Sequence, residues 1–233
     1  MTVANSRLPA LDAGQRQRII ETLTPGRLSK YLQVTNHNQR LALGLYCRNS
    51  TVSAAFFSDI HFLEVALRNK FHIELTAKYG ADWFRAAPFL ALQNPRTQGI
   101  LLKAERDAQK HWTPGVVLPA GKVVAELTFG FWLNLTDKRL EHSLWTPCLH
   151  KAFASGKVPR RSRLNGDLEK IRQLRNRIAH HEAIFHMDLA GLHQTLTLVT
   201  AQLCPDVASL MRRTSSAHHE ICALKVYRRR KGI

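Results

Sequence analysis

Apolar residues recur at helical spacing along most of this chain, and that periodicity constrains the fold more than any other feature. In the segment 58–80, "SDIHFLEVALRNKFHIELTAKYG", the spacing predicts a helix with Ser58 as its N-cap and Gly80 at its end. The apolar positions of this helix are Ile60, Leu63, Leu67, Phe71 and Leu75. Runs that alternate between polar and apolar residues are scarce. The sequence therefore predicts an all-α fold, a single helical bundle domain with additional helices.

Other segments add helices to this picture. Residues 36–57 predict a separate helix before Ser58, and residues 94–112 predict one with Pro95 in its first turn. Residues 188–203 show a further amphipathic pattern. The segment 123–137 is apolar nearly all round, which favours a central helix buried on most sides, with a short strand as the alternative.

Breaker-rich and basic stretches predict the connections. Residues 113–122 hold two prolines and two glycines and are expected to form a loop. Residues 155–167 form a basic linker that either contacts phosphates or is simply solvated, and Asp167 is the expected N-cap of the next helix. These segments predict three parts of the chain. They are an N-terminal helical extension (1–34), a main helical domain (35–204), and a C-terminal helix with a frayed basic tail (205–233).

Charge is the strongest global signal in the composition. Thirty-four Lys and Arg residues against 17 Asp and Glu residues give a net charge of +17, which favours binding to polyanions such as RNA. Solubility alone is the other explanation, and a membrane surface fits less well because the basic residues are spread along the chain. No segment resembles a membrane span or a signal peptide, so we expect a cytoplasmic protein. The four cysteines form no C-x-x-C pair, and we expect neither a metal nor a cofactor.

One stretch, "LRNRIAHHE" at residues 174–182, carries more polar chemistry than a helix needs. If the helix runs over 167–185, one stripe faces the core and Asn176 and His180 are neighbours on the other side, near Ala179 and Ala183. That stripe holds Leu168, Ile171, Leu174, Ile178 and Phe185. A polar pair among small residues suits contact with a second surface. A solvated face with incidental histidines is the alternative.

The residue types match cleavage of RNA by its own 2′-hydroxyl. His transfers protons near neutral pH, Arg binds phosphate with two hydrogen bonds, and Asn orients a histidine or binds a phosphate oxygen. No metal is needed, and the product is a 2′,3′-cyclic phosphate. Arg175 and His180 diverge by about 140° on an ideal helix, so one chain makes a poor site. Two copies related by a two-fold axis would offer both groups to one phosphate.

At these residues the sequence resembles the HEPN superfamily, whose motif is Arg, four to six residues, then His, often with a polar residue after the Arg. Here the motif reads Arg175-Asn176-(RIA)-His180. The longer string "LRNRIAHHEAIF" is similar to the Abi-like (abortive infection) branch, as are "FLEVALRNKF" followed by "YGADWF", and "ELTFGFWLNL". The resemblance covers roughly residues 35–200. Two other matches to the bare spacing, "RDAQKH" and "RTSSAH", lack the Asn and the flanking residues.

The resemblance implies an all-α HEPN-like bundle, a homodimer with facing motifs, and a metal-independent endoribonuclease that acts as a toxin or in phage defence. Such proteins are often restrained by an antitoxin protein or a cognate non-coding RNA. Arg175, His180 and Asn176 are the expected catalytic residues, and a non-catalytic HEPN protein that binds RNA or a partner is the alternative.

Further residues are assigned to supporting roles. His181 also fits the spacing and is expected beside the core as a structural or supporting residue. Glu64 and Arg68 are one turn apart and either pair on the surface or support the site. Candidate RNA contacts are Arg160, Arg161, Arg163, Arg172 and Arg177. The string "HHEAIFH" is no zinc protease motif, because His186 comes one residue too late after His181-Glu182. Clustered carboxylates or a Gly-rich phosphate loop, which a metal hydrolase or nucleotidyl transferase needs, are not found.

Overall fold

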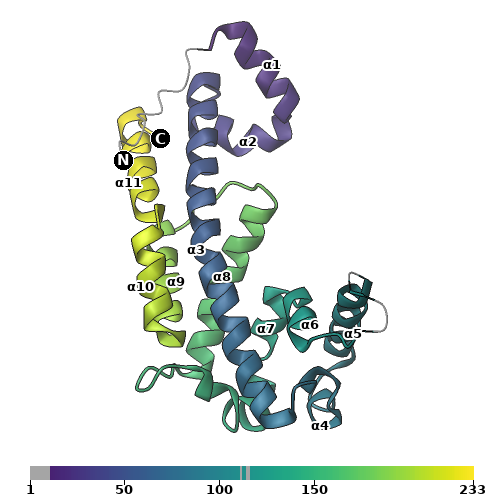
Figure 1. Ribbon diagram of the computed structural model, residues 1–233. Coiled ribbons are helices and arrows are strands. Elements are labelled where there is room, and N and C mark those ends of the chain that lie inside the picture. The colour runs from purple at the N-terminus through teal and green to yellow at the C-terminus, as the bar shows by residue number, and fades with distance from the viewer. Residues whose placement is uncertain (1–10, 111, 114–115) are drawn as a thin grey trace. The chain divides into compact units, whose positions relative to one another are not determined.

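The structure is a computed structural model that describes residues 11–110, 112–113 and 116–233 (Figure 1). The first ten residues of the predicted extension and His111 of the "RDAQKH" string lie outside the described residues. The described residues contain helices and turns but no strand, which confirms the all-α prediction. None of the helices in these ranges has both the length and the apolar character to cross a membrane.

The chain divides into two compact units built from segments that alternate along the sequence. Unit 1 comprises residues 1–57, 175–191 and 216–233, and unit 2 comprises residues 58–174 and 192–215. Helices α3 (Gln39–Tyr79), α8 (Arg161–Ala179) and α9 (Leu189–Leu203) contribute residues to both units. The predicted ranges 1–34, 35–204 and 205–233 stay a prediction.

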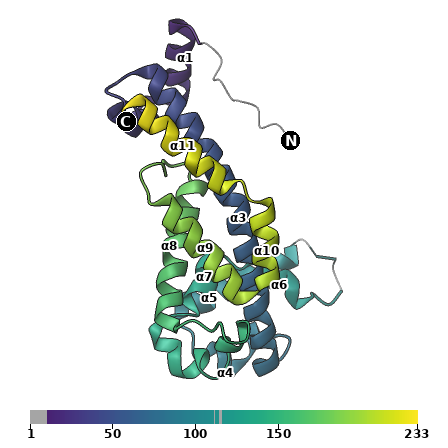
Figure 2. The same ribbon diagram turned by 90° about the vertical axis from the view of Figure 1, so that its left-hand side faces the viewer.

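Unit 1 is built on the first half of α3. It also holds α1 (Ala13–Leu23), α2 (Pro25–Val34), the last turn of α8 and α11 (Ala217–Lys231). Figures 1 and 2 both show α11 alongside the first half of α3, where the Tyr227 hydroxyl donates to the Leu41 carbonyl at 3.1 Å. Tyr31 of α2 is buried with its ring 5.1 Å from that of Phe185. This aromatic contact packs α2 against the segment that follows α8.

Unit 2 gathers its core around Trp83. Its helices, besides the remaining parts of α3, α8 and α9, are α4 (Ala87–Leu90), α5 (Pro95–Lys110), α6 (Ala120–Glu126), α7 (Phe129–Asn134) and α10 (Pro205–Thr214). Short 3-10 turns cover Trp83–Arg85, Lys138–Leu140 and Leu149–Ala152, and a π-helical turn covers Glu141–Trp145. The ring of Trp83 lies 5.1 Å from Phe89, 6.1 Å from Phe131 and 6.0 Å from Trp132. The stretches "YGADWF" and "ELTFGFWLNL" therefore meet in one aromatic cluster.

The long helix α3 corrects the prediction of two helices that meet at Ser58. It runs unbroken through Ser58, because neither Pro nor Gly interrupts residues 45–79. Gly80 does end it, with φ of +90° and its N–H bonded to the Thr76 carbonyl at 2.9 Å. The predicted helix at 94–112 is α5, with Pro95 at its first position, and the predicted helix at 188–203 is α9.

The apolar segment 123–137 is helical, as favoured over a strand, but it is not one helix. It breaks at Leu127 and Thr128, both in extended conformation, between α6 and α7. Helix α6 buries Val123 and Val124, whereas α7 buries Phe129, Phe131 and Trp132. Helix α6 begins at Ala120, so the predicted loop at 113–122 ends earlier than expected.

The basic linker and the basic tail are also more ordered than predicted. Helix α8 begins at Arg161, so most of the expected linker is helical and Asp167 lies inside the helix instead of capping it. Asp167 is buried there and bonded to Arg163 one turn earlier at 2.8 Å. At the C-terminus α11 continues to Lys231 and ends on Gly232 in the left-handed conformation. The tail is therefore helical and not frayed up to that residue.

Candidate active site

The candidate catalytic residues lie where α8 ends. The helix stops at Ala179 and not near residue 185, and the N–H of His180 bonds to the Asn176 carbonyl at 2.9 Å. His181 then adopts a left-handed conformation, with φ of +55°. Its N–H bonds to the Ile178 carbonyl at 3.0 Å, and that of Glu182 to the Arg177 carbonyl at 2.8 Å. This pair of bonds is a Schellman cap, so both histidines belong to the cap of the helix.

This cap changes the expected surroundings of the motif. Asn176 and His180 are still one turn apart, because the backbone bond between them is helical. His180 and His181 are exposed, whereas Arg175 and Asn176 are half-buried. Ala183 was expected on the polar side of the helix, but it follows the cap and is buried. All five residues of the predicted stripe are buried, although Phe185 lies beyond the helix end.

His181 was expected to border the core, and the structure corrects this. Its side chain is exposed, and what matters structurally is its backbone conformation. Residues with φ near +55° are usually Gly or Asn, with His tolerated more often than most side chains. His181 therefore holds the cap in which His180 sits. The sequence signal for this role was weak, because His is an uncommon choice at this position.

Arg27 of α2 fixes the backbone of the two histidines. Its Nη1 donates to the His180 carbonyl at 2.9 Å and to the His181 carbonyl at 3.0 Å. The last carbonyls of a helix have no partner within it and carry partial negative charge, so a guanidinium there satisfies and stabilises them. Sequence reasoning missed this residue, since the two partners are separated by 153 residues in one case and 154 in the other.

Asn49 and Arg228 anchor the segment after the cap. The buried amide oxygen of Asn49 accepts from the N–H of Ile184 at 2.7 Å and of Phe185 at 3.1 Å, and its amide nitrogen donates to the Glu182 carbonyl at 3.4 Å. Arg228 of α11 donates to the Phe185 carbonyl at 3.1 Å. Side chains from α2, α3 and α11 therefore hold the chain from His180 to Phe185.

The cap lies in a positively charged part of unit 1. Arg177 pairs with Glu182 at 3.1 Å, across the two ends of the cap. The pKa of the His186 side chain is lowered, first by partial burial and then by the charges of Lys30, Arg177 and Arg228. An imidazole surrounded by three cations marks a place where an anion would be favoured.

The remaining predicted residues belong to unit 2. Glu64 and Arg68 are half-buried and one turn apart on α3. Arg172 is bonded to Glu169 through two nitrogens, at 2.8 and 2.7 Å, which lowers the pKa of that carboxyl group. Arg160 and Arg163 are exposed.

Arg161 differs from the expectation of a linker arginine that reaches solvent. It is buried, donates to the Thr136 carbonyl at 2.7 Å, and lies 3.1 Å from a Glu141 carboxyl oxygen. Because the guanidinium is already engaged inside unit 2, we remove Arg161 from the candidate RNA contacts.

Chemically, the cap offers an exposed imidazole on a fixed backbone, with an amide and a guanidinium one turn or slightly more before it. In the described ranges, no group of three or more His, Cys, Asp or Glu side chains is arranged to hold a metal ion. Comparison of the chain with protein-family models, curated proteins and solved structures gives no match.

Proposed function

We propose that the chain is a metal-independent endoribonuclease of the HEPN type that works as a homodimer. The observation that carries the proposal is the position of His180, whose side chain is exposed while its backbone is bonded to Asn176 and clamped by Arg27. The backbone that carries this imidazole is held in place, and the imidazole itself is accessible to a substrate. The net charge of +17 supports RNA as that substrate.

In the proposed reaction the 2′-oxygen of one nucleotide attacks the adjacent phosphorus. One imidazole takes the 2′-hydroxyl proton, and a guanidinium such as Arg175 stabilises the charge of the five-coordinate phosphorus. The bond from phosphorus to the 5′-oxygen then breaks, and a water molecule protonates the leaving oxygen and takes up the proton held by the imidazolium. The products are a 2′,3′-cyclic phosphate and a 5′-hydroxyl end.

A second copy is part of the proposal because the residues diverge within one chain. On ideal helical geometry Arg175 and His180 point about 140° apart, and the helical bond from the His180 N–H to the Asn176 carbonyl extends that geometry to His180. We extend the proposal to a cytoplasmic toxin or phage-defence role with restraint by an antitoxin protein or RNA. A non-catalytic protein that binds RNA or a partner through the same surface is the alternative.

The test is cleavage of RNA by the purified protein in EDTA, with the 5′ ends of the products sequenced and the 3′ ends assayed for cyclic phosphate. His180→Ala should slow cleavage by about 10²- to 10⁴-fold, the usual contribution of a proton-transfer residue. The matched control is His218→Ala, which removes another exposed histidine of unit 1 and should cut as the wild type does. Equal rates for the two variants would reject the site, and no cleavage by the wild type would favour the binding alternative.

A further inference from the structure

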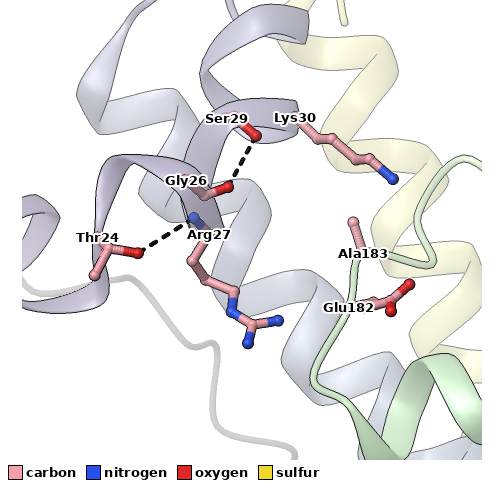
Figure 3. A pocket seen from close by; sticks show the side chains of 7 residues that line it. All are labelled: Thr24, Gly26, Arg27, Ser29, Lys30, Glu182 and Ala183. Atoms are coloured by element: carbon pink, nitrogen blue, oxygen red, sulfur yellow. Dashed lines mark hydrogen bonds between the residues drawn. The ribbon is translucent and has the colours of Figure 1, made fainter.

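A pocket of about 410 Å³ lies beside the histidine cap, between the first turns of α2 and the chain after α8. Figure 3 shows Gly26, Arg27 and Lys30 of α2 on one side and Glu182 and Ala183 on the other. All of these residues belong to unit 1. A volume of this size is sufficient for a nucleotide. The space beside Gly26 is open, since a Cβ added there would meet nothing within 4 Å.

Arg27 and Lys30 offer free donors to this pocket. Only Nη1 of Arg27 is engaged by the His180 and His181 carbonyls, so Nε and Nη2 have no hydrogen-bond partner in the described part of the chain. The Lys30 ammonium extends towards Ala183 in Figure 3. Within the described part of the chain it likewise forms no ion pair. Arg has five N–H donors in a planar fork, so one edge can hold backbone carbonyls while the other binds an anion.

The carboxylate on the pocket wall does not cancel these charges. Glu182 is paired with Arg177 at 3.1 Å. Arg228 of α11 contacts the same segment, because it donates to the Phe185 carbonyl. Lys30, Arg177 and Arg228 all act on the neighbouring His186. Four cations therefore surround one carboxylate at this end of unit 1, which leaves a positive field over the pocket.

We propose that this pocket binds a backbone phosphate of the RNA strand, next to the linkage that is cut, through the free edge of Arg27 and the ammonium of Lys30. The inference rests on the proposed function, because it takes RNA as the ligand. Its location follows from Arg27, which contacts the His180 carbonyl and the pocket with the same guanidinium. A phosphate bound there is held beside the candidate proton-transfer residue.

The test measures binding of a fully 2′-O-methylated RNA, which cannot be cleaved, by fluorescence anisotropy in EDTA at several salt concentrations. The variant is Lys30→Gln, because Lys30 is exposed and, unlike Arg27, holds no part of the cap. Lys225→Gln is the matched control, since it removes the same charge from an exposed position of unit 1 that does not line the pocket. We expect Lys30→Gln to weaken binding about 5- to 10-fold at low salt and to reduce the salt slope by about 0.7, the value for one lost phosphate contact on a single strand. Lys225→Gln should change binding less than about 2-fold.

Free phosphate and a 5′-mononucleotide form the second arm of the test. If RNA is the ligand, these small anions should bind the wild type at least about 10²-fold more weakly than the RNA does, because they make one contact where a strand makes several. Equal effects of Lys30→Gln and Lys225→Gln, or a mononucleotide that binds as tightly as RNA, would overturn the inference while cleavage still reports on the proposed function. A wild type that never cleaves, combined with a loss of binding specific to Lys30→Gln, would reject the nuclease and retain the phosphate site.

Discussion

At the scale of single residues, His181 shows that a residue within a sequence motif can matter through its backbone conformation and not through its side chain. With φ of +55° it occupies the position where helices usually place Gly, as α11 does with Gly232. We therefore expect His181→Gly to raise the free energy of unfolding by about 0.5–1 kcal/mol. His181→Val should lower it by about 1–2 kcal/mol, since a β-branched residue is strained at positive φ. Urea denaturation followed by circular dichroism measures both changes.

His181→Gly, compared with His180→Ala, also tests the division of roles between the histidines. If His180 transfers the proton, His181→Gly should cleave RNA at close to the wild-type rate, under conditions where urea denaturation shows that the variant is folded. Loss of cleavage in His181→Gly, together with normal cleavage in His180→Ala, would give the chemical role to His181 instead.

Asn49 is the residue whose loss should cost the most stability near the site. Its amide oxygen accepts two backbone N–H groups that are otherwise buried, those of Ile184 and Phe185. Asn49→Ala leaves both donors without a partner, and we expect the free energy of unfolding to fall by about 2–4 kcal/mol. Asn69→Ala, at an exposed position of α3, is the control and should change it by less than about 0.5 kcal/mol. Similar values for the two variants would mean that the segment after the cap is not anchored by Asn49.

Residue-level prediction from the sequence succeeded where the signal was local and failed where it was not. The neighbours Asn176 and His180 follow from helical spacing, which the backbone bond between them preserves. Arg27 and Asn49 reach the same segment from positions more than 130 residues away. Nothing in the local pattern separates this arginine or this asparagine from others on the chain, so only the fold identifies them.

At the scale of elements, one hydrogen bond joins α3 to the turn that follows it and makes unit 2 sensitive to pH. The indole N–H of Trp83 donates to Nδ1 of His72 at 2.8 Å, so His72 must be neutral at that nitrogen. Burial lowers the pKa of His72 below its ordinary value of 6.5. Below pH 6.5 the unfolded chain then binds more protons than the folded chain at this site. The stability contributed here is complete above pH 6.5 and is lost as the pH falls through the folded-state pKa.

The measurement is the thermal unfolding midpoint between pH 8 and pH 5 for the wild type and His72→Gln. Gln keeps an acceptor for Trp83 but does not titrate, so the variant should lose less stability on acidification than the wild type. Because all other histidines are shared, the difference between the two profiles isolates His72. Parallel profiles would show that His72 does not couple folding to pH.

Element boundaries were harder to predict than the elements themselves. Periodic apolar residues identified α3, α5, α8 and α9, because burying one face of a helix requires that spacing. Ser58 and Asp167 were misleading, since residues that favour caps are also tolerated inside helices when tertiary contacts outweigh their preference. Asp167 demonstrates this, because it is buried inside α8 and bonded to Arg163. The end of α8 was missed because no Gly or Pro marks it.

At the scale of the whole molecule, the charge of the chain is only partly available to a polyanion. Arg161, Arg172 and Arg177 all contact acidic residues of their own units. Among the residues that the structure describes, the cations without such partners include Lys30 and the free edge of Arg27, beside the histidine cap. Net charge therefore indicates only the class of ligand that we propose, and the distribution of ion pairs indicates where we expect that ligand to bind.

The dimer is the part of the proposal that a single chain cannot supply, and mixing two inactive variants tests it. If one site takes Arg175 from one copy and His180 from the other, Arg175→Ala and His180→Ala should each be inactive alone. A mixed dimer of the two has one site with both residues intact and one site with neither. Random exchange of subunits makes about half of the dimers mixed, so the mixture should regain about a quarter of the wild-type cleavage rate.

The amount of regained activity distinguishes two arrangements. If Arg175 and His180 of the same chain formed the site, no mixture of the two variants would contain an intact site, and the rate would stay at the level of the single variants. A control mixture in which one protein carries both substitutions and the other carries His180→Ala contains no intact site in either arrangement. Recovery in the first mixture but not in the control would show that residues which diverge along α8 act together only across two copies.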